Sequence, residues 1–241
     1  MIEKGQCFPL YWYELPPSAN LFDPSALIRH DGVTDHILDE ARRLYGVDVT
    51  KDDIFYYVYG FLHLPAYREK FANELRKSLP KLILVPRGED FRALSKAGRE
   101  LAELHLNYES QPPPEGVQLG IRNAELGMDE LNSLDDIDWR VTKMRLSKDR
   151  TELRCNDSIT IRNIPARSFE YVVNGRSPLE WIIDRYQVKV DKASQLLNDP
   201  NLWCEEHGDA RYILRLIGSV LTVSLRTMEI VDALPAIAFD D

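Results

Sequence analysis

The spacing of hydrophobic residues is helical in the N-terminal part of this chain and changes near the middle. Hydrophobic positions recur every three or four residues over 34–45, 50–62, 65–77 and 91–106. This spacing is typical of helices that bury one face. The sequence therefore predicts a mainly helical lobe over residues 1–108.

Two of the predicted helices have a capping pattern at their start. Thr50 is followed three residues later by Asp53, and Ser177 is followed by Pro178 and then by Glu180. In such a pair the first side chain accepts a hydrogen bond from the backbone N–H of the later residue, and the acid bonds back to the first backbone N–H. Proline suits the first turn because its missing N–H would have no partner there. We therefore expect helices to begin directly after Thr50 and Ser177.

A proline-rich segment separates the helical lobe from the remainder of the chain. Residues 109–116 read ESQPPPEG, and consecutive prolines cannot continue a helix or a central strand. The sequence therefore predicts a linker over 109–116 and a second lobe over 117–241. The prolines indicate a hinge, and the sequence leaves open whether the two lobes form one rigid unit.

After the prolines, apolar and polar residues alternate, which is typical of strands with one buried face. The strand candidates are 139–147, 151–156, 158–164 and 169–173, with short turns between them. Helical spacing returns over 179–188 and 209–231. The predicted fold class is therefore α+β, with a helical N-terminal lobe plus an antiparallel β-meander flanked by helices.

Charge is distributed unevenly along the chain. The formal net charge is −9, which is the wrong sign for a free-standing nucleic-acid binder because phosphates attract Lys and Arg. Residues 124–138 contain six acids and no base, whereas residues 140–176 contain nine bases and four acids, a local net charge of +5. The second segment is where we expect a polyanion to dock. The alternative is a solvated surface beside a sheet, which composition alone favours.

The sequence patterns of familiar catalytic and cofactor sites are missing. The chain has no phosphate-binding loop that ends in Gly-Lys-Ser/Thr and no GxGxxG pattern. It also lacks the Asp/Asn-Pro-Pro-Tyr/Phe pattern of amino-methyltransferases, the acid-and-lysine pattern of metal-dependent nucleases and a Gly-x-Ser-x-Gly nucleophile turn. We therefore predict no catalytic residue and no cofactor in this chain.

Cysteine usage and hydropathy bear on the compartment. Cys7, Cys155 and Cys204 are odd in number and far apart, so we expect reduced thiols in the cytoplasm and no disulfide framework. Cys204 and His207 form an isolated CxxH, and because a structural zinc ion needs four ligands we predict no metal site. No apolar run is long enough to span a membrane. Residues 1–14 do not have the pattern of a signal peptide.

Four long segments resemble one known family. They are CFPLYWYE (7–14), DIFYYVYGFLHLPAYREKFANELRKSLPKLILV (53–85), FRALSKAGRELAELHLNYE (91–109) and NGRSPLEWIIDRYQVKVDKASQLLNDPN (174–201). The family is the C-terminal specificity domain of the single-chain type ISP restriction-modification enzymes. The segments follow the order of the family through most of the chain, and the resemblance is weakest over 110–165.

The resemblance implies a function. In this family one polypeptide is understood to carry a nuclease, a helicase-like ATPase motor, an adenine-N6 methyltransferase and then this domain. The resemblance implies that the domain, with both predicted lobes, recognises a specific sequence in double-stranded DNA and presents it to the methyltransferase. Its partners would be DNA and the methyltransferase and motor domains of the parent polypeptide. The sites for ATP, magnesium and S-adenosylmethionine would lie in those domains, and this module would be non-catalytic.

The candidate DNA-contacting residues come from the basic segment and not from a family motif. Phosphate contacts hold a protein in register on DNA, and Arg or Lys side chains that reach guanine give specificity. The strand candidates and turns of the basic segment supply such groups. The predicted DNA-binding residues are Lys143, Arg145, Lys148, Arg150, Arg154, Arg162 and Arg176.

Two other functions are compatible with the sequence. One is a protein-interaction or scaffolding domain of the same enzyme with no direct DNA contact, which the aromatic residues Tyr11, Trp12 and Tyr13 favour. The other is a stand-alone hydrolase whose site is assembled from distant residues. DNA binding separates target recognition from scaffolding. A histidine hydrogen-bonded to Ser or Cys in a deep pocket would favour the hydrolase.

Overall fold

The computed structural model describes residues 7–16, 27–121, 124–133 and 138–239. The N-terminal residues 1–6, and the acids Asp135 and Asp136 of the acidic segment, lie outside the described residues. Within the described residues no helix is both long enough and apolar enough to cross a membrane.

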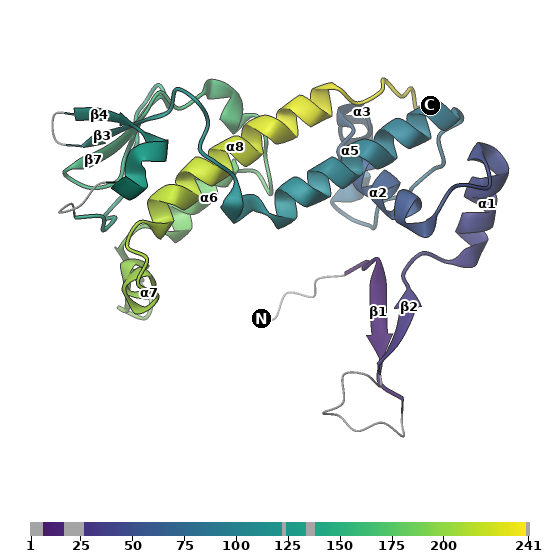
Figure 1. The fold of residues 1–241 in the computed structure, drawn as a ribbon, viewed down its shortest axis with the longest axis horizontal. Helices are drawn as coiled ribbons and strands as arrows, with labels where there is room; N and C mark the ends of the chain where they lie inside the picture. Colours follow the sequence, from purple (N-terminus) through teal and green to yellow (C-terminus); the bar gives the residue numbers. More distant parts are fainter. Residues whose placement is uncertain (1–6, 17–26, 122–123, 134–137, 240–241) are drawn as a thin grey trace. The chain divides into compact units, whose positions relative to one another are not determined.

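The chain forms two compact units. Unit 1 comprises Met1–Ala102 and Ala233–Asp241, and unit 2 comprises Glu103–Asp232. Figure 1 labels their elements, which combine helices with antiparallel strands. The predicted α+β fold class is therefore confirmed.

Unit 1 is mainly helical and carries a two-stranded hairpin. Its elements are β1 (Tyr11–Glu14), β2 (Ile28–Asp31), α1 (Asp35–Tyr45), α2 (Lys51–Phe61), α3 (Pro65–Lys70), α4 (Ala72–Leu75) and α5 (Gly88–Leu106), whose last turn belongs to unit 2. The helices predicted over 34–45, 50–62 and 91–106 are confirmed, and the helix predicted over 65–77 is divided into α3 and α4. The capping box of Thr50 and Asp53 is present with both hydrogen bonds.

The helices α2 and α5 approach each other closely because both carry glycine at the crossing. A Cβ atom at Gly98 would lie 1.8 Å from the carbonyl oxygen of Tyr56, and one at Gly60 would lie 2.2 Å from that of Leu94. Such distances are far below van der Waals contact, so the crossing requires glycine on both helices. Phe61 and Leu94 are fully buried in the core beside this crossing.

Three buried tyrosines tie the core of unit 1 to the extended segment 81–85. The hydroxyls of Tyr45, Tyr57 and Tyr67 donate to the backbone carbonyls of that segment at 2.6, 2.6 and 2.9 Å. A buried tyrosine needs such an acceptor to offset the loss of water. Burial raises the pKa of Tyr45 to about 12, so these hydroxyls stay protonated and keep donating.

Unit 2 contains a sheet, three helices and several short elements. The first of them are η2 (Tyr108–Ser110), β3 (Gln118–Ile121), β4 (Ala124–Gly127), η3 (Met128–Ser133), β5 (Arg145–Leu146), β6 (Leu153–Arg154) and β7 (Ile159–Arg162). The others are η4 (Ala166–Phe169), α6 (Pro178–Arg185), β8 (Lys189–Val190), β9 (Leu197–Asn198), α7 (Asn201–Glu206) and α8 (Tyr212–Asp232). The predicted capping box of Ser177 and Glu180 starts α6.

The sheet of unit 2 is antiparallel, with the strand order β4-β3-β7-β6-β5. Strands β5, β6 and β7 come from the segments 139–147, 151–156 and 158–164, so the predicted meander is confirmed. Strands β3 and β4 extend the sheet, although their residues were not among the strand candidates. The inner face of the sheet shares one hydrophobic core with α6 and α8.

The prediction of a fourth strand over 169–173 is wrong. Ala166–Phe169 is the 3-10 helix η4, and the residues after it form only one isolated bridge, between Val173 and Arg176. The indole Nε1 of Trp181 donates to the carbonyl of Val173 at 2.8 Å. This segment is therefore held by contacts with α6 and by its own tight turn, and no neighbouring strand pairs with it.

Only Arg145–Leu146 of the strand predicted over 139–147 is a strand. In the part before it, the side-chain amide of Asn201 forms hydrogen bonds with the backbone N–H and the backbone carbonyl of Val141. The Val141 N–H donates to Asn201 Oδ1 at 2.8 Å, and the Val141 carbonyl accepts from Asn201 Nδ2 at 2.9 Å. The amide therefore satisfies both backbone groups of Val141 in place of a neighbouring strand, and the next residue, Thr142, donates its N–H to the carbonyl of Cys155 at 2.9 Å.

The proline segment packs on α8 inside unit 2. Ser219 Oγ donates to the carbonyl of Gln111 at 2.8 Å, and Thr222 Oγ1 donates to that of Pro112 at 2.5 Å. A Cβ atom at Gly218 would lie 3.0 Å from the ring of Pro113. The start of the proline segment thus lies along α8, and the carbonyls of Gln111 and Pro112 accept hydrogen bonds from hydroxyls of that helix. The role of 109–116 as a boundary between functional lobes stays a prediction.

Candidate nucleic-acid interface

All seven predicted DNA-binding residues lie in unit 2, and three of them lie on the outer face of the sheet. Because side chains alternate along a strand, Leu146, Leu153 and Ile161 face the core. Their neighbours face outward on the adjacent strands β5, β6 and β7. These outward residues are Arg145, Arg154 and Arg162.

The strand register places two of these arginines side by side. Arg145 on β5 lies directly opposite Arg154 on β6. Like charges at opposite positions destabilise a sheet unless a counter-ion lies nearby. Arg154 has one, because its guanidinium forms an ion pair with Asp157. Arg145 forms no ion pair with the residues that the structure describes.

Arg162 is held more firmly than the other two. Its guanidinium forms an ion pair with Glu125 on β4 and lies 3.4 Å from the carboxylate of Glu152. It also lies over Gly120 on β3, where a Cβ atom would be 3.3 Å from the guanidinium carbon. The glycine therefore makes room for Arg162 to lie across the sheet between its two acids.

Arg150 has a structural role. Its guanidinium lies 3.8 Å from the centroid of the Phe169 ring, and Nη2 lies 2.6 Å from the carboxylate of Glu180. Glu180 also forms the capping box at the start of α6. Arg150 thus connects the turn between β5 and β6 to η4 and α6.

Lys143 and Lys148 lie on either side of β5 and are exposed. Lys148 belongs to the turn between β5 and β6, which is fixed by a hydrogen bond of 2.6 Å from Ser147 Oγ to Asp149. That hydrogen bond is the main cause that lowers the pKa of Asp149. Neither lysine forms an ion pair with another residue in the described part of the chain. Together with Arg145 they make a cluster of three unpaired cations around β5, which we call the β5 cations.

Arg176 lies apart from the sheet, at the tight turn before α6. Nη1 of Arg176 lies 3.3 Å from the carboxylate of Asp184, and its guanidinium carbon lies 5.1 Å from the centroid of the Trp181 ring. The structure therefore brings Arg145, Arg154 and Arg162 together on one face and places Arg176 with α6. The acid partners Glu125 and Glu152 were not predicted, since a strand register is needed to find them.

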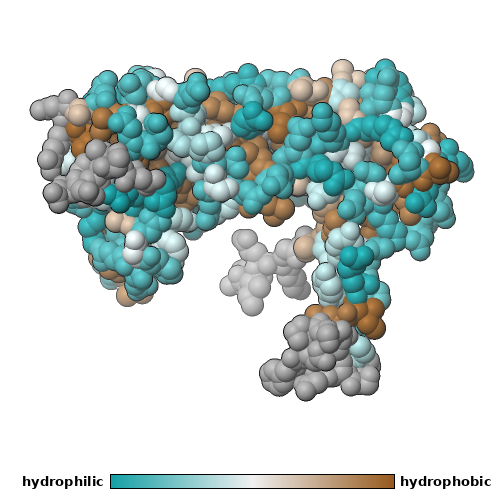
Figure 2. All heavy atoms as spheres, in the orientation of Figure 1, coloured by the Kyte–Doolittle hydropathy of each residue, from teal (hydrophilic) through white to brown (hydrophobic). Residues whose placement is uncertain are grey.

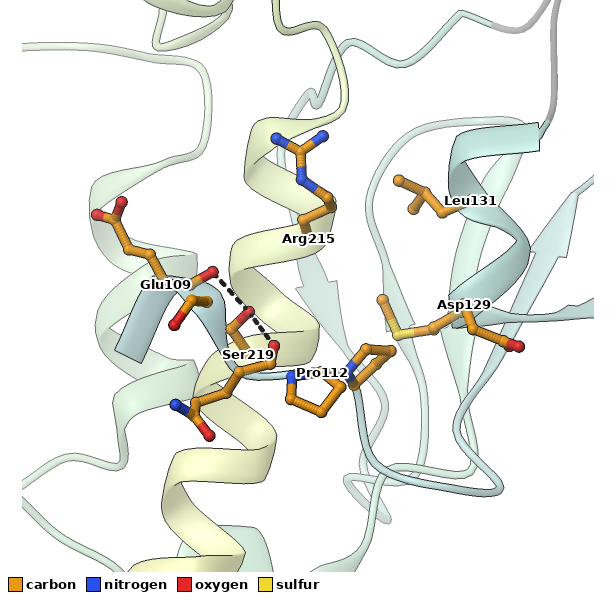
Figure 3. Close-up of a pocket in the computed structure, with 10 residues that line it drawn as sticks. Glu109, Pro112, Asp129, Leu131, Arg215 and Ser219 are labelled. Atoms are coloured by element: carbon orange, nitrogen blue, oxygen red, sulfur yellow. Dashed lines mark hydrogen bonds between the residues drawn. The ribbon is translucent and has the colours of Figure 1, made fainter. Parts of the chain in front are cut away.

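Side chains that line a cavity of unit 2, and two of its histidines, form hydrogen bonds within the protein. One cavity has a volume of about 250 Å³ and is lined by the proline segment, η3 and α8. Figure 3 shows its lining residues, with the Ser219 hydroxyl directed at backbone carbonyls. His105 lies 2.9 Å from Thr227 Oγ1, and His207 lies 2.8 Å from the carbonyl of Trp203. Within the described residues no group of three or more His, Cys, Asp or Glu side chains is placed to hold a metal ion.

Comparisons with known proteins identify the family. The model of the Type ISP C-terminal specificity domain matches residues 1–216. The ATP-dependent Type ISP restriction-modification enzyme LlaBIII, in a structure bound to DNA, is 38% identical with a TM-score of 0.78 over 96% of this chain. A nuclease-deletion mutant of the Type ISP enzyme LlaGI, in complex with a DNA substrate mimic, is 42% identical with a TM-score of 0.67 over 86%.

A third structure, the DrdV–DNA complex, is 28% identical with a TM-score of 0.67 over 87% of this chain. This chain spans 14% of the LlaBIII and LlaGI chains and 20% of the DrdV chain. A comparison with curated proteins gave no match. The family model and the identity to LlaBIII over nearly the whole chain show that this chain belongs to the Type ISP C-terminal specificity domain family.

Proposed function

We propose that this chain recognises a specific sequence in double-stranded DNA through the outer face of the unit 2 sheet. The observation that carries the proposal is the cluster of β5 cations, Lys143, Arg145 and Lys148, in a domain of the specificity family. Cations without an acid partner are free to contact phosphates or guanine. The LlaBIII and DrdV structures contain DNA and the LlaGI structure contains a DNA substrate mimic, which supports DNA as the ligand.

The other predicted residues contribute unequally. Arg154 and Arg162 form exposed ion pairs, which are weak enough in water to be exchanged for phosphate contacts. Arg150 instead supports the turn that presents Lys148. The strands β5 and β6 and their turn form a hairpin at the margin of the sheet, and the major groove of B-DNA accommodates an antiparallel β-ribbon.

We further propose that the chain is the non-catalytic recognition module of a restriction-modification enzyme. The sequence patterns of nucleotide, methyl-donor and nuclease sites are missing from it, and it matches only a small part of the LlaBIII and LlaGI chains. Its partners are then the methyltransferase and motor domains of a parent polypeptide, and it presents the recognised site to the adenine methyltransferase. The chain itself needs no cofactor for this role.

The test is a selection from random duplexes followed by a salt titration. We expect the 241-residue chain to enrich one sequence motif. We expect the triple variant K143Q/R145Q/K148Q to lose that enrichment. Because each lost phosphate contact reduces the slope of log K against log salt by about 0.9, the slope of the variant should fall by up to about three.

The matched control is K77Q/K81Q/K96Q, which removes the same charge from exposed positions of unit 1. Equal losses in both triple variants would mean that net charge, and not the β5 cations, explains the effect. Normal enrichment by K143Q/R145Q/K148Q would contradict the placement of the interface. No motif and no salt-dependent binding by the wild-type chain would contradict DNA recognition itself.

Scaffolding is the second candidate function, and exposed apolar side chains favour it. The side chains in question lie on β8, β9 and α7 and at the residue directly before β9, and each is at least 44% exposed: Val190, Leu196, Leu197, Leu202 and Trp203. Figure 2 shows apolar atoms among hydrophilic ones at the end of unit 2 that carries α7. A chain that binds no DNA but co-purifies stoichiometrically with the methyltransferase domain would support this function.

A further inference from the structure

A second group of cations lies on unit 2 around the end of α6, and it adjoins the segment before β5, because the Val188 N–H donates to the carbonyl of Thr142 at 3.1 Å. Arg176 from the tight turn, Arg185 at the end of α6 and Lys189 on β8 all converge on the carboxylate of Asp184. Their nitrogen–oxygen distances are 3.3, 3.7 and 3.4 Å. Charge-assisted hydrogen bonds are usually about 2.7–2.9 Å long, so none of the three cations is tightly paired with this acid.

The geometry around Trp181 keeps two of these cations close together. The guanidinium carbons of Arg176 and Arg185 lie 5.1 and 5.7 Å from the centroid of its ring. The indole is fixed because its Nε1 donates to the carbonyl of Val173 at 2.8 Å. Two guanidinium groups on one aromatic ring repel each other, and a shared anion removes that repulsion.

The neighbouring acids do not neutralise the cluster. Asp184 stays ionised at neutral pH, because partial burial raises its pKa but the charges of Lys189, Arg176 and Arg185 outweigh that effect and lower it. Glu180 is engaged by Arg150 and Ser177. Asp191, whose pKa Lys189 also helps to lower, accepts hydrogen bonds from the backbone and hydroxyl of Ser194.

Cations are expected at the C-terminal end of a helix, but the cluster has more than the helix needs. A helix C-terminus carries about half a negative charge. Lys189 serves this end directly, since its Nζ lies 2.8 Å from the carbonyl oxygen of Asp184. One carboxylate and half a charge, set against three cations, leave an excess of at most about 1.5 positive charges, and Glu180 offsets part of it through its interaction with Arg176. The three side chains are 43–68% exposed, so this excess faces solvent.

We propose that Arg176, Arg185 and Lys189 form a binding site for a phosphate of the DNA backbone, separate from the β5 cations. This site rests on the proposed function, since its ligand is the duplex that the sheet face recognises. Phosphate contacts of this kind fix register without reading sequence. Asp184 holds the three cations in place in the free protein and competes with the phosphate for them.

Two variants with opposite expected effects test the site on the full chain. In R185Q/K189Q the contact with this phosphate is lost, so the slope of log K against log salt for a labelled duplex should fall by about one. The motif selected from random duplexes should stay the same. In D184N the competing acid is removed, and we expect tighter DNA binding. A purely structural role of Asp184 predicts weaker or unchanged binding instead.

The matched control is R167Q/R226Q, which removes two exposed arginines that pair with Asp232 and Glu229 elsewhere in unit 2. Thermal unfolding of every variant separates lost binding from lost folding. A further arm replaces part of the chloride by inorganic phosphate at constant ionic strength. A phosphate-specific loss of DNA binding in the wild type that disappears in R185Q/K189Q would support the site. Phosphate that protects the wild type but not R185Q/K189Q against thermal unfolding, and leaves DNA binding unchanged, would show a site for free phosphate and overturn the DNA assignment.

The remaining outcomes separate this inference from the proposed function. If the wild-type chain binds its motif and R185Q/K189Q keeps the full salt slope, the phosphate site is refuted while DNA recognition stands. If D184N binds DNA no more tightly than the wild type, the competition is refuted. If the wild-type chain binds no DNA, both the site and the proposed function fail.

Discussion

The close crossing of α2 and α5 gives a prediction with a definite sign. In Gly98→Ala the new Cβ atom would lie 1.8 Å from the carbonyl oxygen of Tyr56 and 2.7 Å from the backbone nitrogen of Gly60. Ordinary contacts of a Cβ atom begin at 3.4 Å. Both clashing atoms belong to the backbone of α2, so no side chain can rotate away. The two helices must therefore separate by more than an ångström.

The expected loss of stability follows from two opposing effects. Alanine in place of glycine favours a helix by up to about 1 kcal/mol, and it also restricts the unfolded chain. Overpacking of a well-packed core costs about 1–3 kcal/mol, and here the separation also loosens the contacts of the buried Phe61 and Leu94. We expect a net destabilisation of about 1–2 kcal/mol.

The control is Gly88→Ala at the start of the same helix. Its Cβ atom would meet only the ring of Tyr45, at 3.7 Å, so this variant should be as stable as the wild type or slightly more stable. The measurement is hydrogen exchange of the α2 and α5 amides, together with urea unfolding. If Gly98→Ala protects these amides as well as Gly88→Ala does, the reasoning about the crossing is wrong.

Three further predictions concern unit 2 and the thiols. R150Q should destabilise unit 2 by about 1 kcal/mol, because it loses an exposed cation–π contact and an ion pair. K148Q, the control, should leave the melting temperature unchanged. Equal melting temperatures of the two variants would contradict the structural role of Arg150. Partial burial raises the pKa of Glu180, but its hydrogen bonds at the start of α6 and the charge of Arg150 outweigh this and lower it. Its contribution is therefore fully present at neutral pH and lost as the pH falls from about 5 through the lowered pKa of the folded state. Below about pH 5, E180Q should lose less stability on acidification than the wild type. Burial raises the pKa of the Cys155 thiol to about 12. A thiol reagent at mildly alkaline pH should therefore label the exposed Cys7 in the native chain and Cys155 only after unfolding. Rapid labelling of Cys155 in the native chain would contradict its burial.

The local features of this fold could be predicted from the sequence because they depend on neighbouring residues. Thr50 and Ser177 start helices where the capping pattern indicated. The helical spacing before the prolines and the alternation over 151–164 also produced the expected elements. In each case the local pattern and the tertiary packing favour the same structure.

The features that could not be predicted depend on residues far apart in the sequence. The strand predicted over 139–147 is shorter than expected because the side-chain amide of Asn201 takes both backbone hydrogen bonds of Val141. The strand predicted over 169–173 is replaced by a turn that Trp181 holds. Alternation in the sequence gives no information about such side-chain contacts.

The candidate interface shows the same division. Basic residues could be assigned to strands from sequence, but their acid partners could not. Glu125 meets Arg162 only through the pairing of β4, β3 and β7. Arg150 is separated from Glu180 by thirty residues of sequence. Which cations are free for a ligand is therefore a property of the tertiary structure.

The position of β5 at the margin of the sheet has a consequence for the behaviour of the chain in solution. This strand has two residues and one side without a partner strand in the described sheet. Such a margin can recruit a strand from another molecule, and short length and charged side chains prevent this. Lys143, Arg145 and Lys148 thus keep two copies of the chain from joining edge to edge. The charges that we assign to DNA contact also protect the protein from self-association while no DNA is bound.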